Sequence, residues 1–229
     1  MKLINNVLSL FYPRLCAACG DALQQNETCI CLDCMLHLPE TQFHKEHFNP
    51  LRQVFDGRVP VEEVTALMSY KKSNRTQKIL HSFKYKGQKE VGVVLGEYLG
   101  GQLITEERYR GIQFILPIPL HPKKQRKRGY NQSEWLAKGL SKGMGIPYLT
   151  DVLVRTQYTD TQTKKNRFAR WQNVKEVFEV HHSEKVSHIH VLVCDDVLTT
   201  GATMEAAIRK LLEVQGVRVS VVTLAATTL

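Results

Sequence analysis

Two adjacent carboxylates followed by a threonine-rich turn are the residues best suited to chemistry in this chain. They lie in residues 191–204, which read VLVCDDVLTTGATM. Threonine hydroxyls and a glycine that permits a tight backbone path suit a phosphate group. The carboxylates would repel that phosphate, so they must bind something beside it, such as vicinal ribose hydroxyls or a nearby Mg²⁺. The pattern predicts a phosphorylated-ribose site made of Asp195, Asp196, Thr199, Thr200, Gly201, Ala202 and Thr203.

A strand and a helix must position these residues. Residues 189–194 (IHVLVC) predict a buried strand, and an apolar stripe predicts a helix near residues 203–214. Ligands of open α/β sheets bind beyond the carboxyl ends of the strands, where the next helix presents unpaired amides and a positive dipole end. The alternative is an ordinary strand-to-helix turn, which would need only one aspartate or threonine as a cap.

Further apolar runs predict the rest of an α/β fold. Unbroken β-branched runs that alternate with helical patterns indicate a parallel sheet covered by helices on both faces. A helical pattern over 74–103 could divide at Tyr85-Lys86-Gly87. We expect a cysteine module at 1–40, a helical linker or hood at 41–108 and an α/β domain at 109–229. Within that domain the expected strands are 114–120, 149–154, 189–194 and 217–226, with a helix near 133–142.

Five of the six cysteines lie between residues 16 and 34. Two CxxC pairs with eleven residues between them have the spacing of two knuckles that bind one tetrahedral Zn²⁺. A full thiolate shell leaves no open coordination position, so this zinc would be structural. Cys29 could replace Cys31, and disulfides or free thiols are the alternative in an oxidising compartment. The predicted ligands are Cys16, Cys19, Cys31 and Cys34.

Two basic segments could bind further phosphate oxygens. Residues 123–128 hold five cations in six positions, which would repel one another on an empty surface. We interpret them as a pyrophosphate loop and basic lid with Arg126 and Arg128 as candidates; a solvated basic turn or a nucleic-acid patch is the alternative. A long polar stretch follows at 155–176, and its candidate cations are Lys164, Lys165, Arg167 and Arg170.

Composition limits the partners and the compartment. The 229 residues carry a net charge of +9, which favours phosphate-bearing ligands without selecting among nucleotide, phosphosugar and nucleic acid. The apolar patch at the N-terminus is broken by Asn5, Asn6 and Pro13, unlike a secretion signal, and no window approaches a membrane span. We therefore expect a cytoplasmic protein without membrane insertion.

The acidic pair and its threonine turn resemble the phosphoribosyl pyrophosphate (PRPP) motif of type I phosphoribosyltransferases. Residues 155–178 resemble the mobile loop of those enzymes. The chain as a whole resembles the ComF (ComFC) family of DNA uptake and utilisation proteins. The resemblance is carried by the four-cysteine N-terminus ending CMLHLP, by FKYKG at 83–87, by PIP at 117–119 leading to RGYNQ at 128–132, and by Thr159, Gln162, Arg170, Asn173 and Phe178.

Three functions follow from these residues and this resemblance. The first is an enzyme that binds Mg²⁺-PRPP and transfers the ribosyl group to an acceptor nitrogen, as in nucleobase salvage. There Asp195 and Asp196 would hold the ribose, and Arg126, Arg128 or the loop cations would hold the leaving pyrophosphate. The second is a competence factor that binds single-stranded DNA and a helicase or recombination mediator. The third, a PRPP-responsive regulator without catalysis, ranks last because no DNA-reading helix pair is apparent.

Overall fold

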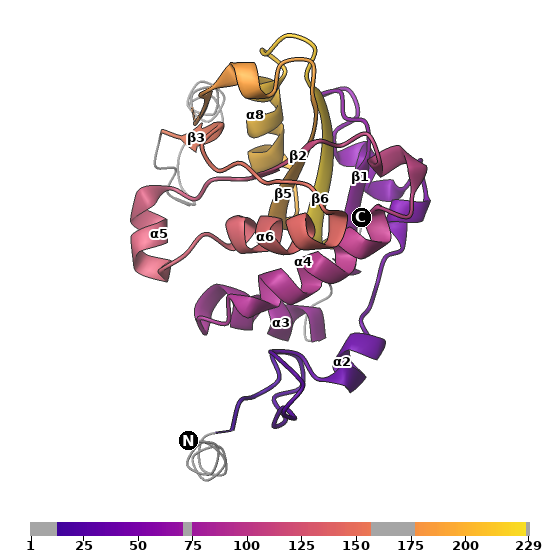
Figure 1. The fold of residues 1–229 in the computed structure, drawn as a ribbon, viewed down its shortest axis with the longest axis vertical. Helices are drawn as coiled ribbons and strands as arrows, with labels where there is room; N and C mark the ends of the chain where they lie inside the picture. The colour runs from indigo at the N-terminus through magenta and orange to yellow at the C-terminus, as the bar shows by residue number, and fades with distance from the viewer. Residues whose placement is uncertain (1–12, 71–74, 157–176, 228–229) are drawn as a thin grey trace.

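A parallel sheet of four strands forms the centre of the molecule in the computed structural model, which describes residues 13–70, 75–156 and 177–227 (Figure 1). The strand order is β1 (Val64–Ser69), β6 (Arg218–Ala226), β5 (His190–Leu198) and β2 (Phe114–Pro117). All three neighbouring pairs are parallel. The sheet confirms the predicted α/β class and three of the four predicted strands.

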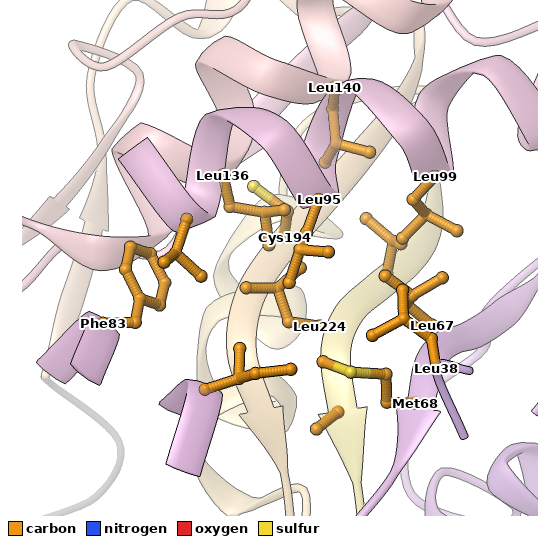
Figure 2. Close-up of a cluster of buried hydrophobic side chains, with 14 of the residues drawn as sticks. Leu38, Leu67, Met68, Phe83, Leu95, Leu99, Leu136, Leu140, Cys194 and Leu224 are labelled. Atoms are coloured by element: carbon orange, nitrogen blue, oxygen red, sulfur yellow. The ribbon is translucent and has the colours of Figure 1, made fainter. Parts of the chain in front are cut away.

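Helices cover both faces of this sheet. On one face lie α3 (Arg75–Tyr85), α4 (Glu90–Leu103) and α6 (Gln132–Met144), and on the other lies α8 (Ala202–Leu211). The expected division of the long helical pattern is confirmed, because Gly87 has φ +70° between α3 and α4. Successive residues of a strand point to opposite faces. Leu192 and Cys194 of β5 therefore pack under α4 and α6, as Figure 2 shows for Cys194, whereas Val191 and Val193 join the core on the α8 side.

Glycines let α4 and α6 approach each other closely. A Cβ atom added at Gly96 of α4 would lie 2.6 Å from the carbonyl oxygen of Leu136. One added at Gly139 of α6 would lie 2.3 Å from the carbonyl oxygen of Val93. No side chain larger than hydrogen fits at these contacts, so the two helices form one rigid layer over the sheet.

Strand β1 was not predicted. It lies within 41–108, where the sequence indicates only helices, and it pairs with β6 in the register Val64↔Val221. Short 3₁₀ helices lie on either side of β1 in the chain: η1 (Phe43–Lys45), η2 (Pro50–Val54) and η3 (Glu107–Tyr109). The 41–108 region therefore contributes an edge strand to the central sheet.

The predicted parallel strand at 149–154 was wrong. Its last residues form β3 (Leu153–Arg155), which pairs antiparallel with β4 (Phe178–Val180) in a separate two-stranded ribbon. An isolated parallel bridge between Tyr148 and Ile115 pairs the chain at the start of this segment with the sheet edge. The apolar run is interrupted by Thr150 and Asp151, both exposed, and the chain leaves the sheet there. The short helix η4 (Ser183–Lys185) follows the ribbon.

The cysteine module lies below α3 in Figure 1 and shares its core. Ala17, Ala18 and Ile30 are buried in the same cluster as Phe83 of α3. Two hydrogen bonds add to the contact: Ser82 Oγ donates to the carbonyl oxygen of Ala17 (3.3 Å), and the side-chain amide of Gln88 donates to that of Leu15 (3.2 Å). The module ends in α2 (Leu32–Leu36), and the remaining helix of the described chain is α5 (Pro122–Arg128). None of the described helices has the length and apolar character that a membrane span requires.

Candidate functional site

The acidic pair lies in the last half of β5, where the buried strand becomes partly accessible. Ser133 Oγ donates a hydrogen bond to Asp195 Oδ1 at 2.7 Å, and the backbone amide of Asp196 donates to the same oxygen at 2.8 Å. Ser133 stands in the first turn of α6, whose N-terminus is capped by the side chain of Asn131. The first turn of α6 therefore fixes the orientation of the Asp195 carboxylate.

The two carboxylates differ in their electrostatic surroundings. Burial and the adjacent charge of Asp196 raise the pKa of Asp195 to about 6, although the Ser133 hydrogen bond acts in the opposite direction. Asp196 has a cation of its own, because Lys84 Nζ lies 3.0 Å from Asp196 Oδ2. The pair therefore combines one partly neutralised carboxylate with one that retains a proton more strongly than an ordinary aspartate.

The threonine turn leads directly from the acidic pair to the N-terminus of α8. Thr199, Thr200 and Thr203 are exposed, and Gly201 occupies the N-cap position with φ +74°. No side chain caps this helix end. The first amides of α8 and the hydroxyls of the three threonines therefore lie together at an accessible helix N-terminus with a positive dipole end.

Residues from outside the motif support the turn. A Cβ atom at Gly201 would lie 2.4 Å from Val54 Cγ1, so η2 packs tightly against the turn. The Arg58 guanidinium donates to the carbonyl oxygen of Thr200 at 3.3 Å and lies 3.6 Å from Glu205 Oε2. The 50–58 segment thus holds the outer side of the turn in place.

Sequence reasoning missed several residues that the fold brings to the site. Lys84 stood in the noted FKYKG segment, and Ser133 began a predicted helix, but neither had a local signal for contact with the aspartates. Arg155 of β3 is a third case: burial lowers the pKa of its guanidinium, and the nearby charge of Asp195 opposes that effect. Arg58 lies in the 41–108 region, which the sequence analysis interprets only as a helical linker or hood.

Two candidates for pyrophosphate binding, Arg126 and Arg128, lie on a separate element. Residues 122–128 form the helix α5 rather than an open loop, and Arg126 is exposed on it. Arg128 donates to Gln132 Oε1 and lies 5.5 Å over the ring of Tyr85. Among the described residues, no ion pair joins either arginine to the acidic pair. Lys164, Lys165, Arg167 and Arg170 lie outside the described residues, so these assignments stay predictions.

The structure brings together the four predicted metal ligands. The Sγ atoms of Cys16, Cys19, Cys31 and Cys34 all lie within 4.8 Å of one another. The Sγ atoms of Cys19 and Cys31 are 3.8 Å apart, the edge expected for a tetrahedron with Zn–S bonds of about 2.3 Å. Backbone amides of Ala18 and Cys31 point at Cys16 Sγ (3.4 and 3.3 Å), which would stabilise thiolates on a metal. Cys29 is buried outside this group, so Cys31 is the fourth member of the cluster.

Comparison with known proteins finds a domain family and two solved structures that resemble parts of this chain. Residues 131–228 match the phosphoribosyl transferase domain family. Among solved structures, a glutamine PRPP amidotransferase from B. subtilis, complexed with ADP and GMP, matches with a TM-score of 0.41 and 20% identity, over 62% of this chain and 30% of that one. This chain thus spans less than a third of that enzyme's length. An adenine phosphoribosyltransferase from Leishmania tarentolae matches with a TM-score of 0.40 and 15% identity, over 64% and 74% of the two chains.

Curated relatives extend the match to the N-terminal regions. The DNA utilization protein YhgH of Escherichia coli (strain K12) is 26% identical over 200 residues, or 86% of this chain and 83% of the relative. Competence protein F of Haemophilus influenzae is 32% identical over 143 residues, or 61% and 62% of the two chains. The competence protein ComFC of Bacillus subtilis is 28% identical over 146 residues, or 63% and 56%.

The parallel sheet and the family match define a protein with a phosphoribosyltransferase-type domain. That domain is combined with a four-cysteine module that could hold a metal such as zinc. Its similarity to YhgH, competence protein F and ComFC supports the resemblance of the whole chain to the ComF family.

Proposed function

We propose that this protein binds PRPP, or a related ribose 5-phosphate ligand, together with Mg²⁺, and that this binding serves DNA uptake or utilisation. One observation carries the ligand class: the acidic pair of β5 and the uncapped N-terminus of α8 are joined by a single short turn. A ligand that satisfies both must carry an anion beside hydrogen-bond donors. A ribose 5-phosphate has a phosphate and vicinal hydroxyls in that relation.

Each part of the ligand has a counterpart in the protein. The 5-phosphate would bind the amides and hydroxyls of the turn from Thr199 to Thr203, and the ribose hydroxyls would donate to Asp195 and Asp196. Burial of the pair strengthens these hydrogen bonds because bulk water competes less. Arg126 and Arg128 of α5 remain the proposed contacts for a leaving pyrophosphate.

Magnesium fits this site as a companion of the ligand. Mg²⁺ prefers oxygen ligands and keeps several waters, so it commonly binds through one or two carboxylates together with phosphate oxygens. Asp195 Oδ1 already accepts two hydrogen bonds and Asp196 Oδ2 already pairs with Lys84. We infer that PRPP oxygens supply most of the metal's ligands. The bound Mg²⁺ would neutralise the negative charge of the pyrophosphate.

The proposed biological setting comes from the relatives, whose names refer to DNA utilisation and competence. In this setting we propose a cytoplasmic protein in which Zn²⁺ on Cys16, Cys19, Cys31 and Cys34 stabilises the 1–40 module. A reducing cytosol keeps such thiols available for metal. The 41–108 region would join that module to the ligand-binding domain and complete the domain with strand β1 of its sheet.

A second candidate function is a catalytically inactive factor that binds single-stranded DNA and a helicase or recombination mediator. Two aromatic side chains beside cations favour it. Tyr85 is 68% exposed and has the Arg128 guanidinium 5.5 Å from its ring centre. Trp135 lies between Lys89 and Lys138, whose ammonium groups are 4.6 and 5.0 Å from its ring centre. Bases stack on exposed aromatic rings while nearby cations attract the phosphates. A third candidate, an active nucleobase phosphoribosyltransferase of salvage, shares the PRPP site with the first proposal.

Calorimetric titration of Mg²⁺-PRPP into the purified full chain tests the first proposal. We expect saturable binding by the wild type and loss of binding when both aspartates of the pair become asparagine. Asp151→Asn is the matched control, because Asp151 forms an exposed ion pair with Lys185 elsewhere on the surface. Absence of PRPP binding by the wild type, or equal binding by the double variant, would refute the proposal.

The DNA-binding candidate has its own test. Fluorescence anisotropy with labelled single-stranded DNA should show binding that weakens steeply with salt, because phosphate contacts release counterions. Tyr85→Ala and Trp135→Ala should each weaken binding, whereas Phe48→Ala should not, although Phe48 is 85% exposed. Salt-insensitive binding, or equal effects of all three variants, would exclude this surface.

A further inference from the structure

Lys84 forms an ion pair with the acidic pair although it lies far from the motif in the chain. Its Nζ is 3.0 Å from Asp196 Oδ2, and the two side chains are only 24% and 13% exposed. Solvent-exposed pairs of lysine and aspartate contribute little, but a partly buried pair leaves an uncompensated charge when either partner is removed. Burial and Asp196 raise the pKa of Asp195, and the charge of Lys84 opposes this rise more weakly. Its charge therefore acts on both aspartates.

The backbone of Lys84 is held in place by its neighbours on α3. Phe83 is fully buried, and its carbonyl oxygen accepts a hydrogen bond from the Tyr130 hydroxyl. Ser82, the residue before Phe83, donates a hydrogen bond to the carbonyl oxygen of Ala17 in the cysteine module. The helix ends just beyond, where Gly87 adopts a positive φ. The ammonium group is therefore carried on a flexible four-carbon stem that projects from a fixed point toward the aspartates.

We propose that Lys84 is a ligand-binding residue: it is the internal cation of the acidic pair, ribose hydroxyls displace it from Asp196, and it then binds the anionic group on C1 of the ribose. This inference rests on the proposed ribose 5-phosphate site. The hydroxyls and the ammonium compete for the same carboxylate oxygens. A released ammonium in this partly buried position needs a new anion, because a buried unpaired charge is costly.

The ligand's own chemistry decides whether that anion is present. The 5-phosphate of any ribose 5-phosphate would be bound at the α8 turn, on the opposite side of the sugar from C1. PRPP carries a second anion at C1, the pyrophosphate, whereas ribose 5-phosphate carries only a hydroxyl there. Lys84 would thus favour the first ligand over the second. Lys84 would therefore help to select the ligand, although it lies outside residues 131–228, which match the phosphoribosyl transferase domain family.

Replacing Lys84 with methionine separates this role from a purely structural one. Methionine keeps an unbranched stem of similar length and removes only the charge. Loss of a charged contact to the pyrophosphate should weaken Mg²⁺-PRPP binding by about 10- to 100-fold. Ribose 5-phosphate should bind equally well or more tightly, because its hydroxyls no longer compete with an ammonium. Lys84→Arg, which keeps the charge, should retain most of the PRPP affinity.

Calorimetry with both ligands, and Lys86→Met as the matched control, completes the experiment. Lys86 is exposed two residues further along and lies beside the cysteine module rather than the aspartates. We expect this control to bind both ligands as the wild type does, and urea unfolding should show that each variant is folded. Equal weakening of both ligands by Lys84→Met, or no change for either, would overturn the role of Lys84 while leaving the site itself intact. Failure of the wild type to bind either ligand would instead refute the proposed function and this inference with it.

Discussion

Replacing Gly201 with alanine should destabilise the protein through two separable effects at the turn between β5 and α8. Gly201 has φ +74°, a conformation that residues with a Cβ adopt at a cost. Its added Cβ would also lie 2.4 Å from Val54 Cγ1. Val54 is buried and β-branched, so its side chain has few alternative rotamers with which to move away. The clash therefore requires a shift of the turn or of η2.

The two effects have different magnitudes. The left-handed backbone costs an alanine roughly 1–2 kcal/mol, which lower entropy of the unfolded chain offsets in part, by about 0.4–1 kcal/mol. Overpacking against Val54 adds about 1–3 kcal/mol. Gly145 isolates the first effect, because it has φ +71° at the end of α6 and no heavy atom within 4 Å of its added Cβ. Gly201→Ala should therefore lower the free energy of unfolding by about 1–3 kcal/mol more than Gly145→Ala.

Urea unfolding followed by far-ultraviolet circular dichroism measures this difference. Val54→Ala should remove the clash, so the double variant of Gly201 and Val54 should be more stable than the sum of the single effects predicts. Gly201→Ala should also weaken PRPP binding, since the turn that we propose for the 5-phosphate must move. If Gly201→Ala costs no more than Gly145→Ala, or if the two substitutions simply add, the close packing of η2 on the turn is not what stabilises it.

Three further outcomes are expected. Because burial and Asp196 raise the pKa of Asp195 from 3.8 to about 6, the folded state holds a proton that the unfolded state releases within this interval. The free energy of unfolding should therefore fall as pH rises from about 4 to 6. Urea titrations of Asp195→Asn should show a weaker dependence of this free energy on pH. An equal dependence in the wild type and the variant would contradict the raised pKa of Asp195. Metal analysis should find one Zn²⁺ per chain, which Cys34→Ser should lose and Cys29→Ser should retain. Substitution of Co²⁺ for this metal should give the absorption spectrum of a tetrahedral thiolate site. Loss of the metal in both variants would count against this ligand set. Gly139→Ala should lower the midpoint of thermal unfolding strongly because it separates α4 from α6, whereas Gly101→Ala, whose added Cβ meets nothing within 4 Å, should leave the midpoint unchanged or raise it.

The parts of the site that could be predicted from the sequence are those whose signals are local. The strand β5, the acidic pair, the turn and α8 follow one another within 22 residues, from His190 to Leu211, so their order alone defines their geometry. The CxxC pairs are local in the same sense, because each knuckle presents two thiolates by itself. Even there the choice between Cys29 and Cys31 depends on the fold, which places Cys31 with the other three thiols, since both lie at a suitable spacing in the chain.

The remaining parts could not be predicted because they depend on contacts between distant residues. Ser133 and Asp195 are 62 positions apart, and their hydrogen bond exists only because α6 crosses the sheet beside β5. Lys84 meets Asp196 for the same reason. Strand β1 has only six residues, and its burial on both faces removes the alternation that identifies a half-exposed strand. The apolar run at 149–154 led to the wrong prediction for a different reason. Its composition favours a strand, but nothing in the run specifies which strand it pairs with.

These long-range contacts also show why the segment that contains the acidic pair and the turn cannot form the candidate site without the rest of the chain. The matched residues 131–228 contain both central strands, but β6 finds its outer partner in β1 and β5 finds its outer partner in β2, and both partners precede that segment. The helix α4 that covers α6, the Val54 contact behind the turn and the cation on Asp196 also come from earlier residues. Without them the segment would expose two unpaired strand edges and the buried face of α6. The region before residue 131 is therefore an integral part of the fold and of the proposed ligand site, and substitutions there should change ligand affinity as directly as substitutions in the motif.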